Sequence, residues 1–196
     1  MKGSLIIIAF FVLGIVVGLQ FSTFNFQFST FILYALMFFV GISIGSDTNT
    51  LKSFRSVNPR LMMLPVMTIF GTLAGTAAAS ALLPHRHLFD CLAIGSGFGY
   101  YSLSSIFITE YKGAELGTIA LLANIMREII TLLCAPLLVK FFGKLAPISM
   151  GGATTMDTTL PIITRTAGQD FIIVSIFHGF CVDFSVPFLV TFFCSL

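Results

Sequence analysis

Two stretches rich in glycine and hydroxyl residues interrupt an otherwise hydrophobic chain: residues 95–105 (GSGFGYYSLSS) and residues 149–161 (SMGGATTMDTTLP). Between them lies an apolar segment, residues 116–139, with polar and charged residues near its middle. A lipid bilayer offers the backbone no hydrogen bonds, so non-helical chain is tolerated at membrane depth only where protein buries it or water reaches it. The paired breaks therefore indicate a transport site.

The composition places the chain in a membrane. Hydrophobic residues make up 57% of its 196 residues and charged residues only 9%, against roughly 25% charged residues in a typical soluble domain. The mean hydropathy of +1.02 agrees with this interpretation. A net charge of +2 without any run of basic residues excludes nucleic acid as a partner. The four cysteines have neither metal-ligand nor disulfide spacing, so we expect no metal or other cofactor.

Hydropathy predicts an all-α integral membrane protein with about five transmembrane helices in a single transporter domain, residues 1–196. Each apolar segment has roughly the 17 to 25 residues that a helix needs to cross a bilayer. The first segment follows Lys2 as a secretory signal would, but it lacks a cleavage site, so we interpret it as a membrane helix. The five segments are residues 4–20, 29–46, 60–83, 116–139 and 171–195.

The two breaks lie within longer segments, residues 88–110 and 144–166. Each is long enough to cross the bilayer once as a kinked helix, or to enter and return as two half-helices of about ten residues. Cytoplasmic loops are enriched in lysine and arginine. With the N-terminus in the cytoplasm, seven crossings leave six of these residues inside and three outside, whereas two hairpins leave seven inside and two outside. The charge distribution therefore favours two re-entrant hairpins, with kinked spanning helices as the alternative.

A single membrane span separates the two predicted hairpins, so they enter from opposite faces of the bilayer. This inverted arrangement is typical of many secondary transporters, whose substrate sites lie near the midplane where the repeats meet. We therefore expect the two tips to meet near the midplane and the C-terminus to lie in the periplasm.

Ionisable residues occur in the second break and in the span between the breaks. Asp157 lies shortly before Pro161, whose missing backbone donor favours a helix break. Asn124 and Glu128 are four residues apart and share one helix face, whereas Arg127 points about 100° away from Glu128. Ionisable groups inside a membrane are expensive and mark functional sites by default. The alternative is a structural network in which Arg127 neutralises one of the acids.

An acid in an apolar surrounding has a raised pKa, because desolvation disfavours its charged form. Such a group can exchange a proton near neutral pH and, when it is ionised, attract a cation. Glu128 and Asp157 would therefore suit a cationic substrate that moves one way while protons move the other. The N-termini of the half-helices would present free backbone N–H groups to an anionic group of the substrate. A zwitterion with an additional positive charge fits both features.

The second half of the chain carries several long motifs. They are SGFGYYSLSSIFITE, the N-x-x-R-E group at residues 124–128, GGATTMDTTLPII, RTAGQD and FHGF around His178. With these motifs the chain resembles the LysO family of bacterial lysine exporters, strongly from residue 95 to the C-terminus and less closely before it. The resemblance implies an inner-membrane exporter of L-lysine, and of the toxic analogue thialysine, driven by proton exchange. It also implies that the functional intramembrane acids are Glu128 and Asp157.

Full-length members of that family have an additional N-terminal membrane portion, and this chain begins where that portion would end. One expectation is a separately encoded partner protein, which would make this chain one half of a two-component exporter. The other is a self-sufficient protein that assembles as a homodimer. The sequence leaves both alternatives open.

Two groups of residues form the predicted transport site. The first tip is expected to hold the backbone groups of the amino acid, and the second tip, together with Glu128, to handle the cation and the proton. The predicted translocation residues are Glu128, Asp157, Asn124, Arg127 and His178. The predicted substrate-binding tip residues are Gly97, Gly99, Tyr100, Tyr101, Ser102, Gly151, Gly152, Thr154 and Thr155.

Several further residues and functions have simpler alternatives. His178 is either a proton relay or a packed core histidine. Asp170 is expected to be a helix-end charge, and Asp183, inside the last span, fits no part of the family pattern. A channel or a non-transporting subunit would share most of these features. An intramembrane hydrolase is disfavoured, because no nucleophile motif surrounds Ser102, Ser104 or His178.

Overall fold

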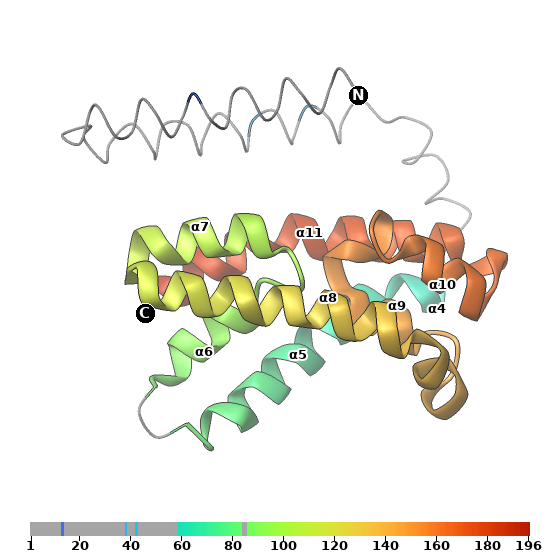
Figure 1. The fold of residues 1–196 in the computed structure, drawn as a ribbon, viewed down its shortest axis with the longest axis horizontal. Coiled ribbons are helices and arrows are strands. Elements are labelled where there is room, and N and C mark those ends of the chain that lie inside the picture. The colour runs from blue at the N-terminus through green and yellow to red at the C-terminus, as the bar shows by residue number, and fades with distance from the viewer. Residues whose placement is uncertain (1–12, 14–37, 39–41, 43–58, 84–85) are drawn as a thin grey trace. The chain divides into compact units, whose positions relative to one another are not determined.

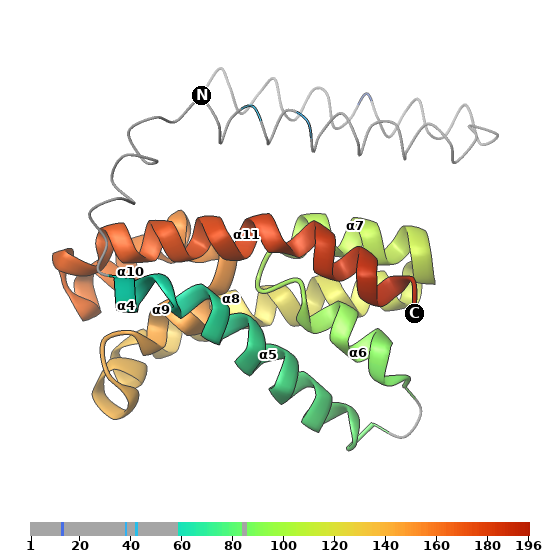
Figure 2. The same cartoon turned by 180° about the vertical axis from the view of Figure 1, so that it is seen from behind.

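The computed structural model describes residues 13, 38, 42, 59–83 and 86–196, and every regular element among them is a helix (Figures 1 and 2). The chain divides into two compact units, Met1–Thr48 and Asn49–Leu196. Apart from residues 13, 38 and 42, the membrane helices predicted at residues 4–20 and 29–46 lie outside the described residues. All the helices named below belong to the second unit.

Three helices in the described part of the chain are long and apolar enough to cross a membrane. They are Arg60–Ser80, Ala114–Phe142 and Gln169–Cys194. The helices predicted at residues 60–83, 116–139 and 171–195 are thereby confirmed. The first comprises α4 (Pro59–Met62) and α5 (Leu64–Ser80), the second is α8 (Ala114–Phe142), and the third comprises η2 (Gln169–Phe171) and α11 (Ile172–Cys194).

Shorter helices flank the two breaks. Around the first break they are α6 (Leu88–Gly95) and α7 (Tyr101–Lys112). Around the second they are α9 (Ala146–Gly151), the 3-10 helix η1 (Gly152–Met156) and α10 (Leu160–Ala167). Both predicted breaks therefore interrupt helices, as the glycines and hydroxyl residues indicated.

The first break reverses the chain at Phe98 and Gly99, whose φ angles are 45° and 93°. Glycine adopts this left-handed conformation without steric cost. A non-glycine residue there costs of the order of 1–3 kcal/mol, so Phe98 is held in place by its contacts. The Lys112 ammonium lies 3.4 Å from a carboxylate oxygen of Asp90. This ion pair joins the outer ends of α6 and α7. The two helices therefore enter and leave at the same end of the fold.

Two prolines and a glycine define the second break. Pro147 and Pro161 stand in the first turns of α9 and α10, where a missing backbone N–H costs no helical hydrogen bond. Gly152 ends α9 with a φ of 63° and turns the chain into η1. Ile148 of α9 and Ile163 of α10 are fully buried in one apolar cluster with residues of α11. Both helices therefore pack on the last span.

The two broken units approach the middle of α8 from its opposite ends (Figures 1 and 2). α7 leads into the first turn of α8 through Gly113, and α9 follows its last turn after Gly143. This course of the chain agrees with two opposed hairpins. Their depth in a bilayer stays a prediction, as does the organisation of residues 1–196 as one transporter domain.

Candidate functional site

The two breaks touch each other through their backbones. The Ala153 N–H donates a hydrogen bond to the Phe98 carbonyl oxygen at 2.9 Å. A Cβ atom at Gly152 would lie 2.1 Å from the same oxygen, and one at Gly99 would lie 3.1 Å from the carbonyl oxygen of Gly151. The contact leaves no room for a side chain at Gly152. The breaks therefore meet as predicted, and their position relative to the bilayer midplane stays a prediction.

Asn124 of α8 holds the first break. Its carboxamide oxygen accepts the Gly99 N–H at 2.8 Å, and its nitrogen donates to the carbonyl oxygens of Ile94 at 3.2 Å and Ala120 at 2.9 Å. Ile94 lies in the last turn of α6, where carbonyl groups lack helical partners. Asn124 is only 3% exposed, so its side chain supplies hydrogen bonds to these backbone groups in place of water.

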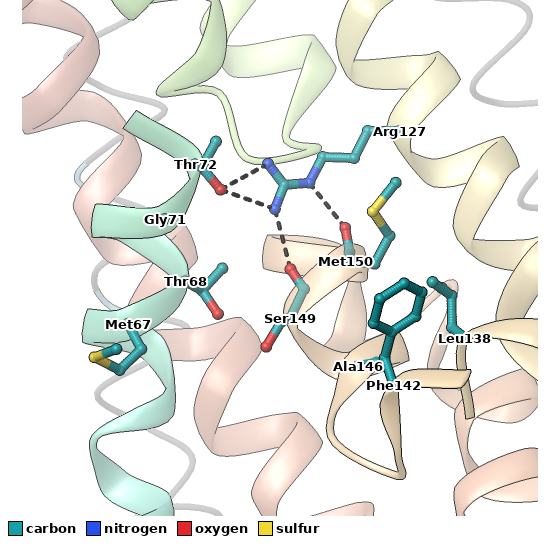
Figure 3. Close-up of a pocket in the computed structure, with 10 residues that line it drawn as sticks. All are labelled: Met67, Thr68, Gly71, Thr72, Arg127, Leu138, Phe142, Ala146, Ser149 and Met150. Atoms are coloured by element: carbon teal, nitrogen blue, oxygen red, sulfur yellow. Dashed lines mark hydrogen bonds between the residues drawn. The ribbon is translucent and has the colours of Figure 1, made fainter. Parts of the chain in front are cut away.

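Arg127, almost one turn further along α8, holds the second break (Figure 3). Its Nε donates to the Met150 carbonyl oxygen at 2.8 Å, and one terminal nitrogen donates to the Ser149 carbonyl oxygen at 3.1 Å. These carbonyls end α9, where the helix dipole favours a positive charge. Both terminal nitrogens lie 3.4 Å from the Thr72 hydroxyl of α5. The guanidinium also lies over the Phe98 ring of the first break, 5.7 Å from its centre.

The two predicted acids are not neutralised by Arg127. Among the described residues, Arg127 binds carbonyl and hydroxyl oxygens and forms no ion pair, so the alternative of a charge-neutralising network is wrong for this part of the chain. Glu128 is half-buried, and its carboxylate forms no hydrogen bond or ion pair with any described residue. Asp157 is exposed, and one of its oxygens accepts the Thr158 N–H at 2.6 Å.

A cavity of about 540 Å³ lies beside Arg127, between α5, α8 and α9 (Figure 3). This volume falls within the range of small-ligand pockets, roughly 300–1,000 Å³. Its polar lining consists of Arg127, the hydroxyls of Thr68 and Thr72, and the backbone of Ser149 and Met150. The remaining lining is apolar. The cavity therefore presents a cation and hydrogen-bonding groups, and neither predicted acid lines it.

His178 is fully buried and connects three elements. Its Nε2 lies 2.9 Å from the Thr68 hydroxyl of α5, and its Nδ1 lies 3.2 Å from the Thr155 hydroxyl of η1. The single hydrogen of Thr155 has closer acceptors in the carbonyl oxygens of Gly152 and Ser175, at 2.8 and 2.9 Å. We therefore assign the neutral tautomer in which Nδ1–H donates to Thr155 and Nε2 accepts from Thr68. This geometry favours the packed core histidine, and the role in translocation stays a prediction.

The predicted tip residues differ in exposure. The buried ones are Gly97, Gly99, Gly151, Gly152, Thr154 and Thr155. The hydroxyls of Thr154 and Thr155 donate to carbonyl oxygens of their own break, so both are already engaged. Tyr100 is half-buried, whereas Tyr101 and Ser102 are exposed at the start of α7. Whether these residues bind substrate stays a prediction.

The structure also brings residues to the junction that the sequence analysis did not place in the transport site. Thr68 and Thr72 of α5 bind the imidazole and the guanidinium described above. Asp183 of α11 is only 7% exposed and lies one helical turn after Gly179, which contacts η1 at Met156, directly before Asp157. The available signal in the sequence was an acid inside an apolar span, because intramembrane ionisable residues mark functional sites by default.

The apolar helices that can span a membrane, together with two opposed broken helices that meet between them, define a multi-pass membrane protein. The sequence matches the model of the family described as "Lysine exporter LysO" over residues 8–194. The chain therefore belongs to the LysO lysine exporter family, which confirms the resemblance carried by its motifs.

Two relatives extend this comparison. The chain is 36% identical to the lysine exporter LysO of Escherichia coli K12 over 176 residues, which cover 90% of this chain and 58% of that protein. It is 34% identical to a proposed lysine exporter of Haemophilus influenzae over 165 residues, which cover 84% of this chain and 83% of that protein. The chain thus spans less than two thirds of the E. coli relative. No solved structure matches it.

We expect Gly152→Ala to destabilise the protein strongly, because the new Cβ would collide with the Phe98 carbonyl oxygen and the φ of 63° already disfavours a side chain. Gly168→Ala is the matched control, since its φ is 112° but no atom lies within 4 Å of the new Cβ. The free energy of unfolding should fall by about 1 kcal/mol in the control and by roughly 3 kcal/mol or more at Gly152. Thermal unfolding in detergent measures both. Equal losses would show that the breaks are not in contact.

We expect Arg127→Lys to loosen the second break although the positive charge is kept. A lysine ammonium is a point charge and cannot reproduce the fork that binds the Ser149 and Met150 carbonyls together. The free energy of unfolding should fall by about 1–3 kcal/mol. The control is Arg165→Lys on the exposed face of α10, which should change stability little. Denaturant titration of the purified variants tests this, and an unchanged Arg127→Lys midpoint would exclude the carbonyl clamp as a stabilising contact.

Proposed function

We propose that this chain exports L-lysine, and the analogue thialysine, across the bacterial inner membrane in exchange for protons. The observation that carries the proposal is the direct contact between two opposed broken helices, with acids beside it that Arg127 does not neutralise. Broken helices that meet at a repeat interface are where secondary transporters bind substrate. Membership of the lysine exporter family, and the names of the two relatives, support lysine as the substrate.

Glu128 and Asp157 are the proposed carriers of the cation and the proton. Glu128 is half-buried on α8 and has no partner among the described residues, so its carboxylate is available. Asp157 uses one oxygen to accept the Thr158 N–H, and its other oxygen has no described partner. An acid of this kind binds either a proton or an ammonium group, but not both. This mutual exclusion is the physical basis of antiport.

Binding of the amino-acid end of the substrate at the first tip would require the junction to open. The Gly99 N–H and the Phe98 carbonyl oxygen are both engaged, with Asn124 and Ala153 respectively. Substrate groups would have to replace these bonds. We therefore propose that this contact between the breaks closes the pathway, and that its separation belongs to the transport cycle.

We further propose that the two broken units are re-entrant hairpins that enter from opposite faces of the bilayer. The lysine and arginine distribution supports a cytoplasmic N-terminus and a periplasmic C-terminus. We also propose that the chain assembles in one of two ways, either with a separately encoded N-terminal partner or as a homodimer.

The proposal is tested by lysine efflux from proteoliposomes with an imposed proton gradient. Glu128→Gln and Asp157→Asn should each abolish efflux while the protein stays folded. Glu115→Gln is the matched control, because this exposed acid lies in the first turn of α8 and pairs with Arg86. The control should keep efflux near that of the unmodified chain.

Two other outcomes would each reject part of the proposal, and a third would decide between the two proposed assemblies. Undiminished efflux from both acid variants would remove the proposed mechanism. Efflux that persists after the proton gradient has collapsed would indicate a channel. A chain that exports lysine only when a short membrane protein encoded beside it is present would be one half of a two-component exporter.

A further inference from the structure

Asp183 lies on the face of α11 that packs against the second break. One turn earlier, Gly179 approaches η1 so closely that a Cβ there would lie 2.7 Å from the Met156 backbone nitrogen. Residues four positions apart share a helix face, so Asp183 continues this contact surface toward the junction of the breaks. Its side chain is only 7% exposed.

The Asp183 carboxylate has no partner in the described part of the chain. No hydrogen bond or ion pair joins it to a described residue, although more than nine tenths of the residue is buried. Every fully enclosed side-chain nitrogen or oxygen among the described residues does have a partner. The oxygens of Asp183 must therefore reach an accessible space. A carboxylate that is buried and unpaired is costly unless a proton or a cation accompanies it.

Two polar side chains lie at the elements that pack against the Asp183 face of α11. Asp157 directly follows Met156, the η1 residue that α11 approaches at Gly179, and Tyr100 directly precedes α7, which also packs on α11. Two carboxylates and a phenol are thereby placed where η1 and α7 pack on α11, and no described lysine or arginine forms an ion pair with Asp183.

We propose that Asp183, Asp157 and Tyr100 form the subsite for the side-chain ammonium of the substrate, with Asp183 as a residue that selects basic amino acids. An ammonium has three N–H donors, and the three side chains offer one oxygen acceptor each. The inference rests on the proposed function, since it assigns a part of the lysine molecule to these groups. It adds a third acid to the two that the sequence motifs indicated.

Binding to the purified full chain tests the subsite with two ligands, lysine and norleucine, whose side chain ends in a methyl group at the ε-carbon and lacks the lysine ammonium. Asp183→Asn should weaken lysine binding by at least about tenfold, as expected for the loss of a charge-assisted hydrogen bond. Any binding of norleucine should be unchanged. Asp183→Glu should retain the preference for lysine over norleucine. The matched control is Asp170→Asn, an exposed acid just before α11, which should bind lysine like the unmodified chain.

A second measurement uses the unmodified chain and so does not depend on how the variants fold. A hydrophobic carbodiimide should label Asp183, as read by peptide mass spectrometry, and lysine but not norleucine should protect it. Unchanged lysine binding by Asp183→Asn, or labelling that lysine does not slow, would overturn the subsite. If export by the unmodified chain persists in either case, the proposed function stands without it. If the unmodified chain neither binds nor exports lysine, the proposed function itself fails.

Discussion

The junction depends on finding partners for the backbone groups that two broken helices leave outside any helix. In an apolar surrounding each unpaired group costs several kcal/mol. Here α8 supplies the partners: Asn124 binds an amide and a carbonyl of the first broken unit, and Arg127 binds two carbonyls of the second. The two breaks also pair with each other, through the hydrogen bond that the Ala153 N–H donates to the Phe98 carbonyl oxygen. One long helix therefore aligns both breaks.

This arrangement separates the polar residues that hold the junction from those that remain available. Asn124 and His178 are buried, and like Arg127 they are engaged with neighbouring elements. Glu128 and Asp183 have no partner among the described residues. In the proposed mechanism, a substrate cation or a proton would occupy the acids without competing for the contacts that maintain the fold.

Much of the fold was predictable because the signals are local. Hydropathy predicts the long helices, and Pro161 and Gly152 mark helix ends through their own backbone chemistry. The partners of Arg127 were not predictable in this way. They lie 22 and 23 residues further along the chain, at Ser149 and Met150, and charge alone suggested an acid instead.

The sequence by itself determined the membrane helices, the position of the breaks and the family, because each depends on residue type and order along the chain. Only the tertiary structure decided that Asn124 and Arg127 serve one break each and that Asp183 lies on the face of α11 that packs against η1. Partner choice for a buried polar group depends on which elements meet in space. The packing of α11 on η1, and of one break on the other, brings together groups that the sequence keeps far apart.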